Sequence, residues 1–201
     1  MKIEEKRKTS ESEIKVVLED GQRRDMKIDT GLNFLNHQVK QIAWRLCMNI
    51  DASIKNTTEY RSTHTMSEDL GIVLGRALLK MYEQKAKEGV NGFGAAYGVI
   101  DEARAFAAVS IEGRANSFVE MCPEIERLEL VEDMLCWDLV AFLEGLAQGM
   151  KATVQVNIER GRDPHHSWEA TYRALGEALK IALQKNEWRK GTIAGVKGTL
   201  E

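Results

Sequence analysis

The hydrophobic pattern of the chain alternates between the two-residue period of a β-strand and the period of about 3.6 residues of an α-helix. In the first half, it predicts strand, strand, helix, strand and helix in that order, with the turn signal Asp20-Gly21 between the first two strands. The predicted elements are Glu13–Glu19, Met26–Asp29, Phe34–Met48, Ile50–Lys55 and Ser67–Lys87. A glycine-rich segment, Gly89–Gly98, then predicts a break between two halves.

The second half repeats this order of elements. Its predicted elements are Phe106–Ile111, Asn116–Glu120, Trp137–Met150, Thr153–Ile158 and a long helix whose apolar stripe runs from Trp168 to Leu183. In each half the last helix begins at an H-x-x-x-E segment. An internal duplication is the simplest explanation of this repeat. We therefore predict two α+β halves, residues 1–88 and 89–201, packed as one globular unit, because no Gly/Ser-rich linker separates them.

Composition and charge exclude several classes of protein. The 201 residues are 43% hydrophobic and 29% charged, which argues against disorder, and the net charge of −3 gives no global attraction to nucleic acid or to an anionic membrane. No apolar run approaches the roughly 20 residues of a membrane-spanning helix, and the first eleven residues offer no apolar stretch to a signal peptidase. The three cysteines are not spaced as a metal knuckle and are expected to be reduced thiols. We expect a cytoplasmic protein without nucleic-acid or membrane partners.

The histidines carry the clearest chemical signal. The chain has only four, and three of them stand in the two H-x-x-x-E segments. Because residues four apart share a helix face, His64 can converge with Glu68, and His165 with Glu169. His166 is turned by about 100° from its neighbour and should belong to a different site. Imidazole and carboxylate together suit a divalent transition metal such as Mn, Fe or Zn. The alternative is a pair of solvated helical ion pairs.

Other catalytic motifs are absent from the sequence. It contains no H-E-x-x-H, C-x-x-C, G-x-G-x-x-G, P-loop or G-x-S-x-G pattern. Their absence disfavours zincins, nucleotide-dependent enzymes and serine hydrolases. A metal site built on the histidines is therefore the main chemical candidate.

Segments along the whole chain resemble the motifs of the imidazoleglycerol-phosphate dehydratase family. They are RKTSES, TGLNFLNH, HTMSEDLGIVLGRAL, IDEARA, EGR, DPHHSWEATYRALGEAL and VKGTL, between Arg7 and Leu200. They follow the order and spacing of the family patterns R-x-T-x-E-T, T-G-x-x-F-L-D-H, H-H-T-V-E-D-x-G-I-x-L-G, M-D-E-A, S-G-R, D-H-H-x-x-E-A and S-T-K-G-x-L. The resemblance implies a manganese-dependent lyase of histidine biosynthesis. It also implies a duplicated, ribosomal-protein-S5-domain-2-like α+β fold, in which each half is a mixed sheet with two helices on one face.

The resemblance further implies two manganese sites, each lacking one imidazole. The four positions of the first site are His37, Thr65, His165 and Glu169. The four positions of the second site are His64, Glu68, Ala141 and His166. A threonine hydroxyl is a poor ligand and alanine is none, so two histidines and one glutamate remain in each site. Three protein ligands can still hold a metal with open positions, although the affinity should fall.

The phosphate-binding positions of the family are only partly kept. The resemblance places Arg114 and Lys197 on the substrate phosphate, whereas Gly92 and Gly195 replace an arginine and a serine of the family patterns. A phosphate monoester normally needs several charge-assisted donors. The same resemblance implies a homo-oligomer, built from trimers that assemble into a 24-subunit shell, with active sites between subunits.

Two glutamates are the candidate catalytic residues. Glu11 matches a substrate-contacting glutamate of the family and is the candidate acid/base, while Glu169 is expected to act as a metal ligand. Asn36 replaces the aspartate of F-L-D-H. The expected function is the metal-assisted dehydration of an imidazole-bearing polyol phosphate, with the metals as Lewis acids and template. The alternatives are a metal-dependent enzyme acting on another substrate and a non-catalytic assembly protein with the same fold.

Overall fold

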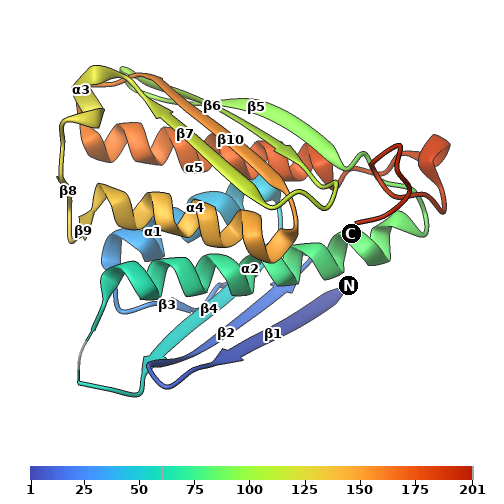
Figure 1. Ribbon diagram of the computed structural model, residues 1–201, viewed down its shortest axis with the longest axis horizontal. Coiled ribbons are helices and arrows are strands. Elements are labelled where there is room, and N and C mark those ends of the chain that lie inside the picture. Colours follow the sequence, from blue (N-terminus) through green and yellow to red (C-terminus); the bar gives the residue numbers. More distant parts are fainter. Residues whose placement is uncertain (60, 201) are drawn as a thin grey trace.

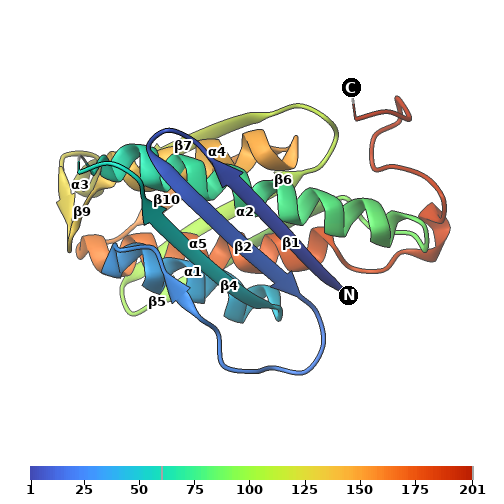
Figure 2. The same cartoon turned by 90° about the horizontal axis from the view of Figure 1, so that it is seen from below.

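Two four-stranded sheets enclose a layer of helices in the computed structural model, which describes residues 1–59 and 61–200 (Figure 1). The first half consists of β1 (Lys2–Lys8), β2 (Ser12–Glu19), β3 (Ile28–Asp29), α1 (Asn33–Leu46), β4 (Asn49–Asn56) and α2 (Thr63–Ala86). Its strand order is β1-β2-β4-β3, and only β3 and β4 pair in parallel. Figure 2 shows the long strands of this sheet crossing the helices obliquely.

The second half has the same topology. Its main elements are β5 (Phe93–Ile100), β6 (Ala103–Ser110), β7 (Asn116–Met121), α4 (Cys136–Met150), β10 (Thr153–Arg160) and α5 (Pro164–Ala182). Its strand order is β5-β6-β10-β7, with β10 and β7 parallel. Each of these strands and helices therefore has a counterpart in the first half, and His64 and His165 lie at the start of equivalent helices, α2 and α5. The predicted fold class, duplicated α+β halves with mixed sheets, is confirmed.

The second half carries an insertion that the first half lacks. Between β7 and α4 the chain forms a short helix, α3 (Pro123–Glu126), and a small hairpin of β8 (Leu130–Val131) and β9 (Met134–Leu135). In the first half, only residues 30–32 connect β3 to α1. The hydrophobic pattern did not predict this insertion, because its elements are too short to show a period.

The prediction of a break over Gly89–Gly98 is wrong for most of this segment. Strand β5 begins at Phe93, and the break is confined to the turn before it, where Gly89 and Gly92 have positive φ values of 91° and 71°. The glycines within the strand permit close packing on α5, because a Cβ atom at Gly94 or Gly98 would lie 2.0 or 1.9 Å from a carbonyl oxygen of that helix. The glycines of β5 therefore indicate close contact between α5 and the second sheet.

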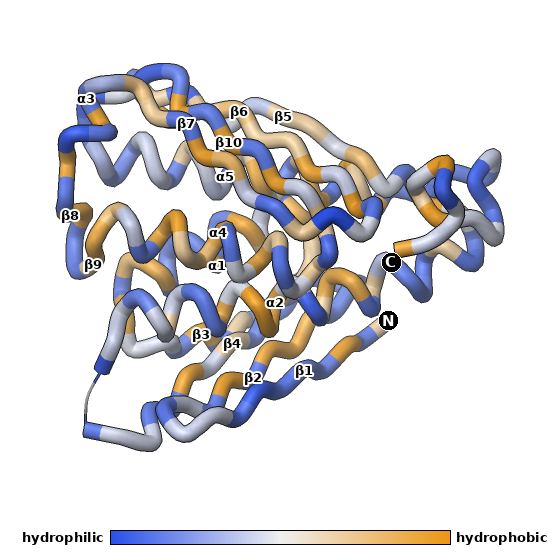
Figure 3. Tube along the Cα trace, in the orientation of Figure 1, coloured by the Kyte–Doolittle hydropathy of each residue, from blue (hydrophilic) through white to orange (hydrophobic). Residues whose placement is uncertain are grey.

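Strand β1 was not predicted, because its sequence, KIEEKRK, is almost entirely charged. It is an edge strand in which Ile3 alone is buried, and Figure 3 shows its hydrophilic character against the apolar interior. The 3₁₀ helix η1 (Glu187–Arg189) was not predicted either, and the remaining α-helices and strands agree with the predicted elements to within a few residues.

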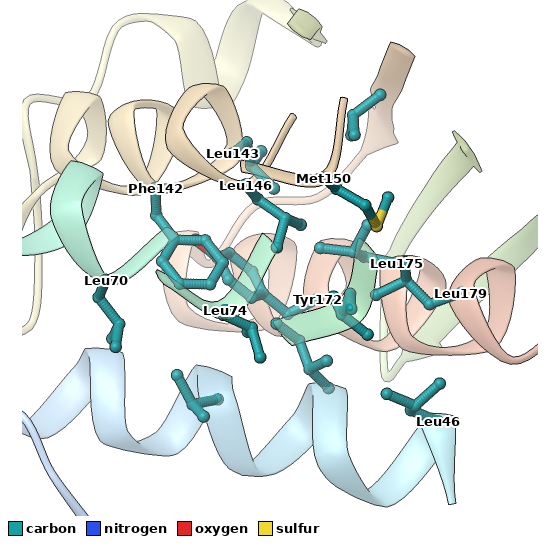
Figure 4. Packing of buried hydrophobic residues seen from close by; sticks show 14 of the residues in the cluster. Leu46, Leu70, Leu74, Phe142, Leu143, Leu146, Met150, Tyr172, Leu175 and Leu179 are labelled. Carbon is teal, nitrogen blue, oxygen red and sulfur yellow. The ribbon is translucent and has the colours of Figure 1, made fainter. Parts of the chain in front are cut away.

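The helices of the two halves pack against each other in the middle of the molecule. Helix α2 contacts α4 along its length, and α1 contacts α5, so both halves share one hydrophobic core. Figure 4 shows side chains from all four helices meeting there, among them Leu70, Phe142 and Leu175. Because all four helices bury apolar side chains in this core, the position of one half fixes that of the other. In the described part of the chain, no helix has the length and apolar character that crossing a membrane requires.

Candidate metal centre and active site

Two histidines and one glutamate converge between α1 and α5. The Nε2 atom of His37 lies 2.6 Å from Oε2 of Glu169, and the Nε2 atom of His165 lies 3.4 Å from the same oxygen. The three donor atoms lie within 4.8 Å of one another, and no other such group occurs in residues 1–59 and 61–200. Glu169 is buried, while both imidazoles are half-buried and remain accessible from solvent.

An aromatic ring forms the floor of this group. Phe34, which is 2% exposed, places its ring centroid 6.3 Å from that of His37 and 5.0 Å from that of His165. Phe34 and His37 are three residues apart in α1, so the helical period puts them on one face. The apolar ring restricts the positions that both imidazoles can adopt.

Hydrogen bonds from Arg173 and Gln41 also connect Glu169 and His37 to neighbouring elements. Arg173 forms an ion pair with Oε1 of Glu169, and its Nη1 donates to the carbonyl oxygen of Val99 at 3.0 Å. Its Nε donates to the side-chain oxygen of Gln41 at 3.3 Å, and the amide nitrogen of Gln41 lies 3.4 Å from Nε2 of His37. The network therefore links α5 to both α1 and β5.

Glu169 is held in its charged form. Burial acts to raise the pKa of its carboxyl group, but the hydrogen bond from His37 and the positive charge of Arg173 outweigh burial, so the pKa is lowered from its usual value of 4.5. A carboxylate must be deprotonated to bind a metal. The arrangement thus keeps Glu169 ready for that role at neutral pH.

The donor set fits a divalent transition metal. Two imidazole nitrogens and a carboxylate oxygen are ligand types that such ions accept, and three protein ligands leave positions open for a further ligand or a substrate. These residues are three of the four positions expected for the first metal site. The fourth position, Thr65, lies on α2, and its hydroxyl is hydrogen-bonded to Ser62 at the start of that helix.

Thr65 lies beside Glu11 at the start of α2. Both line a small cavity, whose other lining residues are Ser12, Asn56, Ser62 and Met66. The hydroxyl of Thr65 donates to Oγ of Ser62 at 3.0 Å, and the backbone N–H of Thr65 also donates to that oxygen, which caps the helix. The Thr65 side chain is therefore already committed to the helix N-terminus, whereas Glu11 is exposed.

Of the four positions expected for the second metal site, three lie near one another within one chain and the fourth, His166, is not grouped with them. His64 and Glu68 lie one turn apart on α2, and Nδ1 of His64 lies 4.0 Å from Oδ1 of the buried Asp138 on α4. Ala141 is buried one turn further along α4, on the stripe that continues to Gly145, where a Cβ atom would lie 2.1 Å from the backbone of α2. Ala141 therefore faces α2 at the level of the His64–Glu68 turn.

His166, the last member of the second set, faces a different side of α5. Its Nδ1 lies 2.9 Å from Oε2 of Glu102, and its ring is nearly perpendicular to that of His165. The other oxygen of Glu102 accepts the backbone N–H groups of Asp163 and Arg162. These backbone hydrogen bonds and the one from His166 lower the pKa of Glu102 to about 2, and Glu102 in turn raises the pKa of His166. Adjacent histidines thus have separate partners, as the helical period predicts.

The expected phosphate-binding residues lie on the surface near the C-terminal segment. Arg114 and Lys197 are both exposed. Gly92 has a positive φ of 71°, and a Cβ atom there would lie only 2.0 Å from that of Ala194, so the position excludes an arginine. At Gly195 a Cβ atom would lie 3.6 Å from the Glu112 carboxylate. The negative charge of Glu112 therefore lies beside one of the positions that the resemblance assigns to phosphate binding.

Sequence reasoning missed several residues that contact the candidate metal ligands or their partners. Gln41 and Arg173 each follow a candidate ligand, His37 or Glu169, by four residues on the same helix, so the helical period could have found them. Glu132 is different. Its carboxylate lies 2.9 Å from Nδ1 of His165, but it belongs to the small hairpin and no periodic signal points to it.

Two sheets of equivalent strand order, a shared helix core and the His37–His165–Glu169 group define a duplicated α+β protein with a candidate metal-binding centre. Residues 30–179 match the family model for imidazoleglycerol-phosphate dehydratase. The chain belongs to the imidazoleglycerol-phosphate dehydratase family, which confirms the resemblance found in its sequence.

Individual relatives match over nearly their full length. The chain is 35% identical to the imidazoleglycerol-phosphate dehydratase of Clostridium novyi over 94% of its own length and 93% of the relative. It is 31% identical to that of Staphylococcus saprophyticus over the whole of both chains. Among solved structures, the enzyme of Pyrococcus furiosus is 27% identical with a TM-score of 0.78, and the match covers 96% of this chain and 98% of that one. The Staphylococcus aureus enzyme is 26% identical with a TM-score of 0.77, over 92% and 100% of the two chains.

Proposed function

We propose that this chain dehydrates imidazoleglycerol phosphate as a carbon–oxygen lyase of histidine biosynthesis. The observation that carries the proposal is the convergence of His37, His165 and Glu169 on one point, in a chain that matches the family over almost its full length. Neither alternative from the sequence, an enzyme for another substrate or a non-catalytic assembly protein, is favoured by these relatives. The free cysteines suit a reducing, cytoplasmic location.

The proposed cofactor is Mn²⁺. His37, His165 and Glu169 would hold one ion, and His64, Glu68 and His166 would contribute to a second. When bound, the metal supplies Lewis-acid polarisation and a template that orients the substrate. Glu169, whose ionised form is favoured by His37 and Arg173, supplies a negative charge to the first centre.

The active site is proposed to form between two copies of the chain. In the family pattern, Thr65 belongs with His37, His165 and Glu169. In one chain it lines a small cavity with Glu11, and none of those three residues lines that cavity. A neighbouring copy that brings Thr65 to this group would bring the Glu11 carboxylate with it. Glu11 would then act as general base or acid on the substrate, a role that its exposure permits.

Arg114 and Lys197 are proposed to bind the substrate phosphate. Both are exposed cations close to the C-terminal segment, and a phosphate favours charge-assisted donors of this type. Glu112 opposes them with a negative charge near Gly195. We therefore expect phosphate binding to be weaker than a complete set of donors would provide.

A homo-oligomer, with trimers assembling into a 24-subunit shell, is proposed from the family and from one face of the fold. On the outer face of the second sheet, Phe93, Tyr97 and Phe118 are 53%, 56% and 55% exposed. The equivalent face of the first sheet carries ion pairs instead, for example between Glu4 and Lys15. An apolar face of this kind on a globular domain marks an interaction surface, and a second copy of the chain is the partner that the proposed shared active site requires.

The function is tested with the full-length chain, treated with chelator and then supplied with Mn²⁺. We expect conversion of imidazoleglycerol phosphate to its keto product, and a loss of at least about 100-fold in Glu169→Gln. Glu177→Gln on the same helix is the matched control and should retain activity. The proposal would be rejected if the native chain showed no turnover at Mn²⁺ concentrations at which the metal is bound.

A further inference from the structure

The small hairpin of β8 and β9 touches both helices that carry the His37–His165–Glu169 group. At its turn, Glu132 places Oε1 2.9 Å from Nδ1 of His165 on α5. The next residue, Asp133, accepts the backbone N–H groups of Asn33 and Phe34 at 2.6 and 2.9 Å, at the start of α1. Two consecutive carboxylates therefore connect the hairpin to α5 and α1.

Glu132 occupies a backbone conformation that favours glycine. Its φ of 51° lies in the left-handed region, which a side chain with a Cβ atom adopts at a cost in stability. From this conformation the glutamate carboxylate reaches His165 and forms a hydrogen bond with its imidazole. A residue that is conformationally unfavourable and contacts a candidate ligand points to a role at that ligand.

The contact determines which nitrogen of His165 is available. When Nδ1–H donates to Glu132, the neutral imidazole carries its free lone pair on Nε2, and Nε2 is the atom that faces Glu169 and His37. A carboxylate on the far nitrogen also makes the imidazole a stronger donor to a metal. Asp133 meanwhile fixes the first turn of α1, one turn before His37.

We propose that Glu132 is a positioning residue for the metal centre, which selects the tautomer and orientation of His165 through the bond to Nδ1. This inference rests on the proposed metal-binding function of His37, His165 and Glu169. Glu132 itself does not touch the reacting atoms. It acts only through His165.

Glycine is the most informative substitution, because it removes the carboxylate and relieves the backbone conformation at once. In Glu132→Gly we expect the Mn²⁺ dissociation constant, measured by calorimetry on the full-length chain, to rise by about 10- to 100-fold. We expect the metal-free protein to melt at the same temperature as the native chain or higher. Glu132→Gln, whose amide oxygen can still accept from Nδ1–H, should give an intermediate loss of Mn²⁺ affinity.

Glu129→Gln, an exposed glutamate at the base of the same hairpin, is the matched control and should bind Mn²⁺ as the native chain does. Unchanged Mn²⁺ affinity in Glu132→Gly would overturn the inference while leaving the proposed function intact. A lower metal-free melting temperature in Glu132→Gly would overturn it too, since Glu132 would then be a structural residue. Absence of Mn²⁺ binding by the native chain would overturn both the metal assignment and the role of Glu132.

Discussion

His37 on α1 and Glu169 on α5 share a hydrogen bond of 2.6 Å, although 132 positions separate them in the sequence. The bond crosses from the first half of the duplicated fold to the second. The candidate metal centre is therefore a product of how the halves pack, since neither half contains its three donors. A variant that loosens the α1–α5 contact should lose metal affinity without any change to a ligand.

The position of the missing imidazole in the first site can be tested by restoring it. We expect Thr65→His to tighten Mn²⁺ binding by more than about tenfold, or roughly 1.4 kcal/mol, measured by calorimetry on the assembled protein. The gain should disappear in the His165→Ala background, because both side chains are expected to serve one centre. Unchanged Mn²⁺ retention after dialysis would count against this assignment.

Restoring the second imidazole should have a cost that the first does not have. Ala141 is 1% exposed and faces α2, so Ala141→His must displace neighbouring atoms. We expect a loss of about 1–3 kcal/mol in the free energy of unfolding, seen as a lower melting temperature without metal. Thr65→His, at a half-buried position, is the comparison and should melt close to the native chain. Equal melting temperatures for all three proteins would show that space is available at Ala141.

Phosphate binding should improve when the opposing negative charge is removed. In Glu112→Ser we expect the KM for the phosphate substrate to fall several-fold with kcat little changed, because the carboxylate near Gly195 repels the phosphate and takes no part in the chemistry. Glu124→Ser, an exposed glutamate on α3, controls for the change in net charge. An equal fall of KM in both variants would assign the effect to overall charge.

Self-association should depend on the aromatic face of the second sheet. We expect the double variant Tyr97→Lys/Phe118→Lys to elute as smaller species in size-exclusion chromatography with light scattering, because two ammonium groups would be buried without partners. Trp188→Lys, at a side chain that is 89% exposed and lies off this sheet, is the control. A native particle size in the double variant would place the subunit contacts elsewhere.

The stability of the protein in acid should depend on the ion pair between Asp51 on β4 and Arg24. Burial acts to raise the pKa of Asp51, but hydrogen bonds from Arg24 and from the N–H of Lys27 outweigh it, so the pKa falls below its usual value of 3.8. A carboxyl group with a lowered pKa stabilises the fold above its unfolded-state pKa, and this stabilisation is lost as the pH falls through the folded-state value.

The comparison is therefore between neutral and strongly acidic solution. Near pH 7 we expect Asp51→Asn to lower the free energy of unfolding by about 1 kcal/mol, measured by urea denaturation. As the pH falls below 3.8 and through the lower folded-state pKa of Asp51, the difference from the native chain should shrink and then vanish. Asp29→Asn, at an exposed aspartate on β3, should show neither effect. A difference that persists unchanged at low pH would contradict the role of the Asp51 charge.

The sequence predicts helices and strands best where one face of the element packs against the core. Helices such as α5 and strands such as β10 show a clear period, because their apolar side chains point one way. Strand β1 escaped prediction because an edge strand can be charged on nearly every residue. The glycines of β5 predict a break because glycine is common in turns, whereas in the structure they allow α5 to approach the sheet.

The sequence predicts the candidate ligands of the site, but it does not predict the residues that position those ligands. Sequence motifs indicated His37, His165 and Glu169, and the structure places these three together; their catalytic and metal-binding roles stay predictions. Nothing in the sequence pattern connects Glu132 to His165, because the contact depends on the path of a short hairpin. Such supports follow from tertiary packing, which the hydrophobic period does not encode.

The hairpin between β7 and α4 also bears on how a duplicated protein can change over evolutionary time. Equivalent connections in the two halves descend from one loop of the duplicated unit, and the first half has a short one. The longer connection gives His165 a partner on a segment for which the first half has no counterpart, so a substitution there can alter His165 without altering its equivalent, His64. The two halves thus differ in the connection between β7 and α4, while their sheets keep the same strand order.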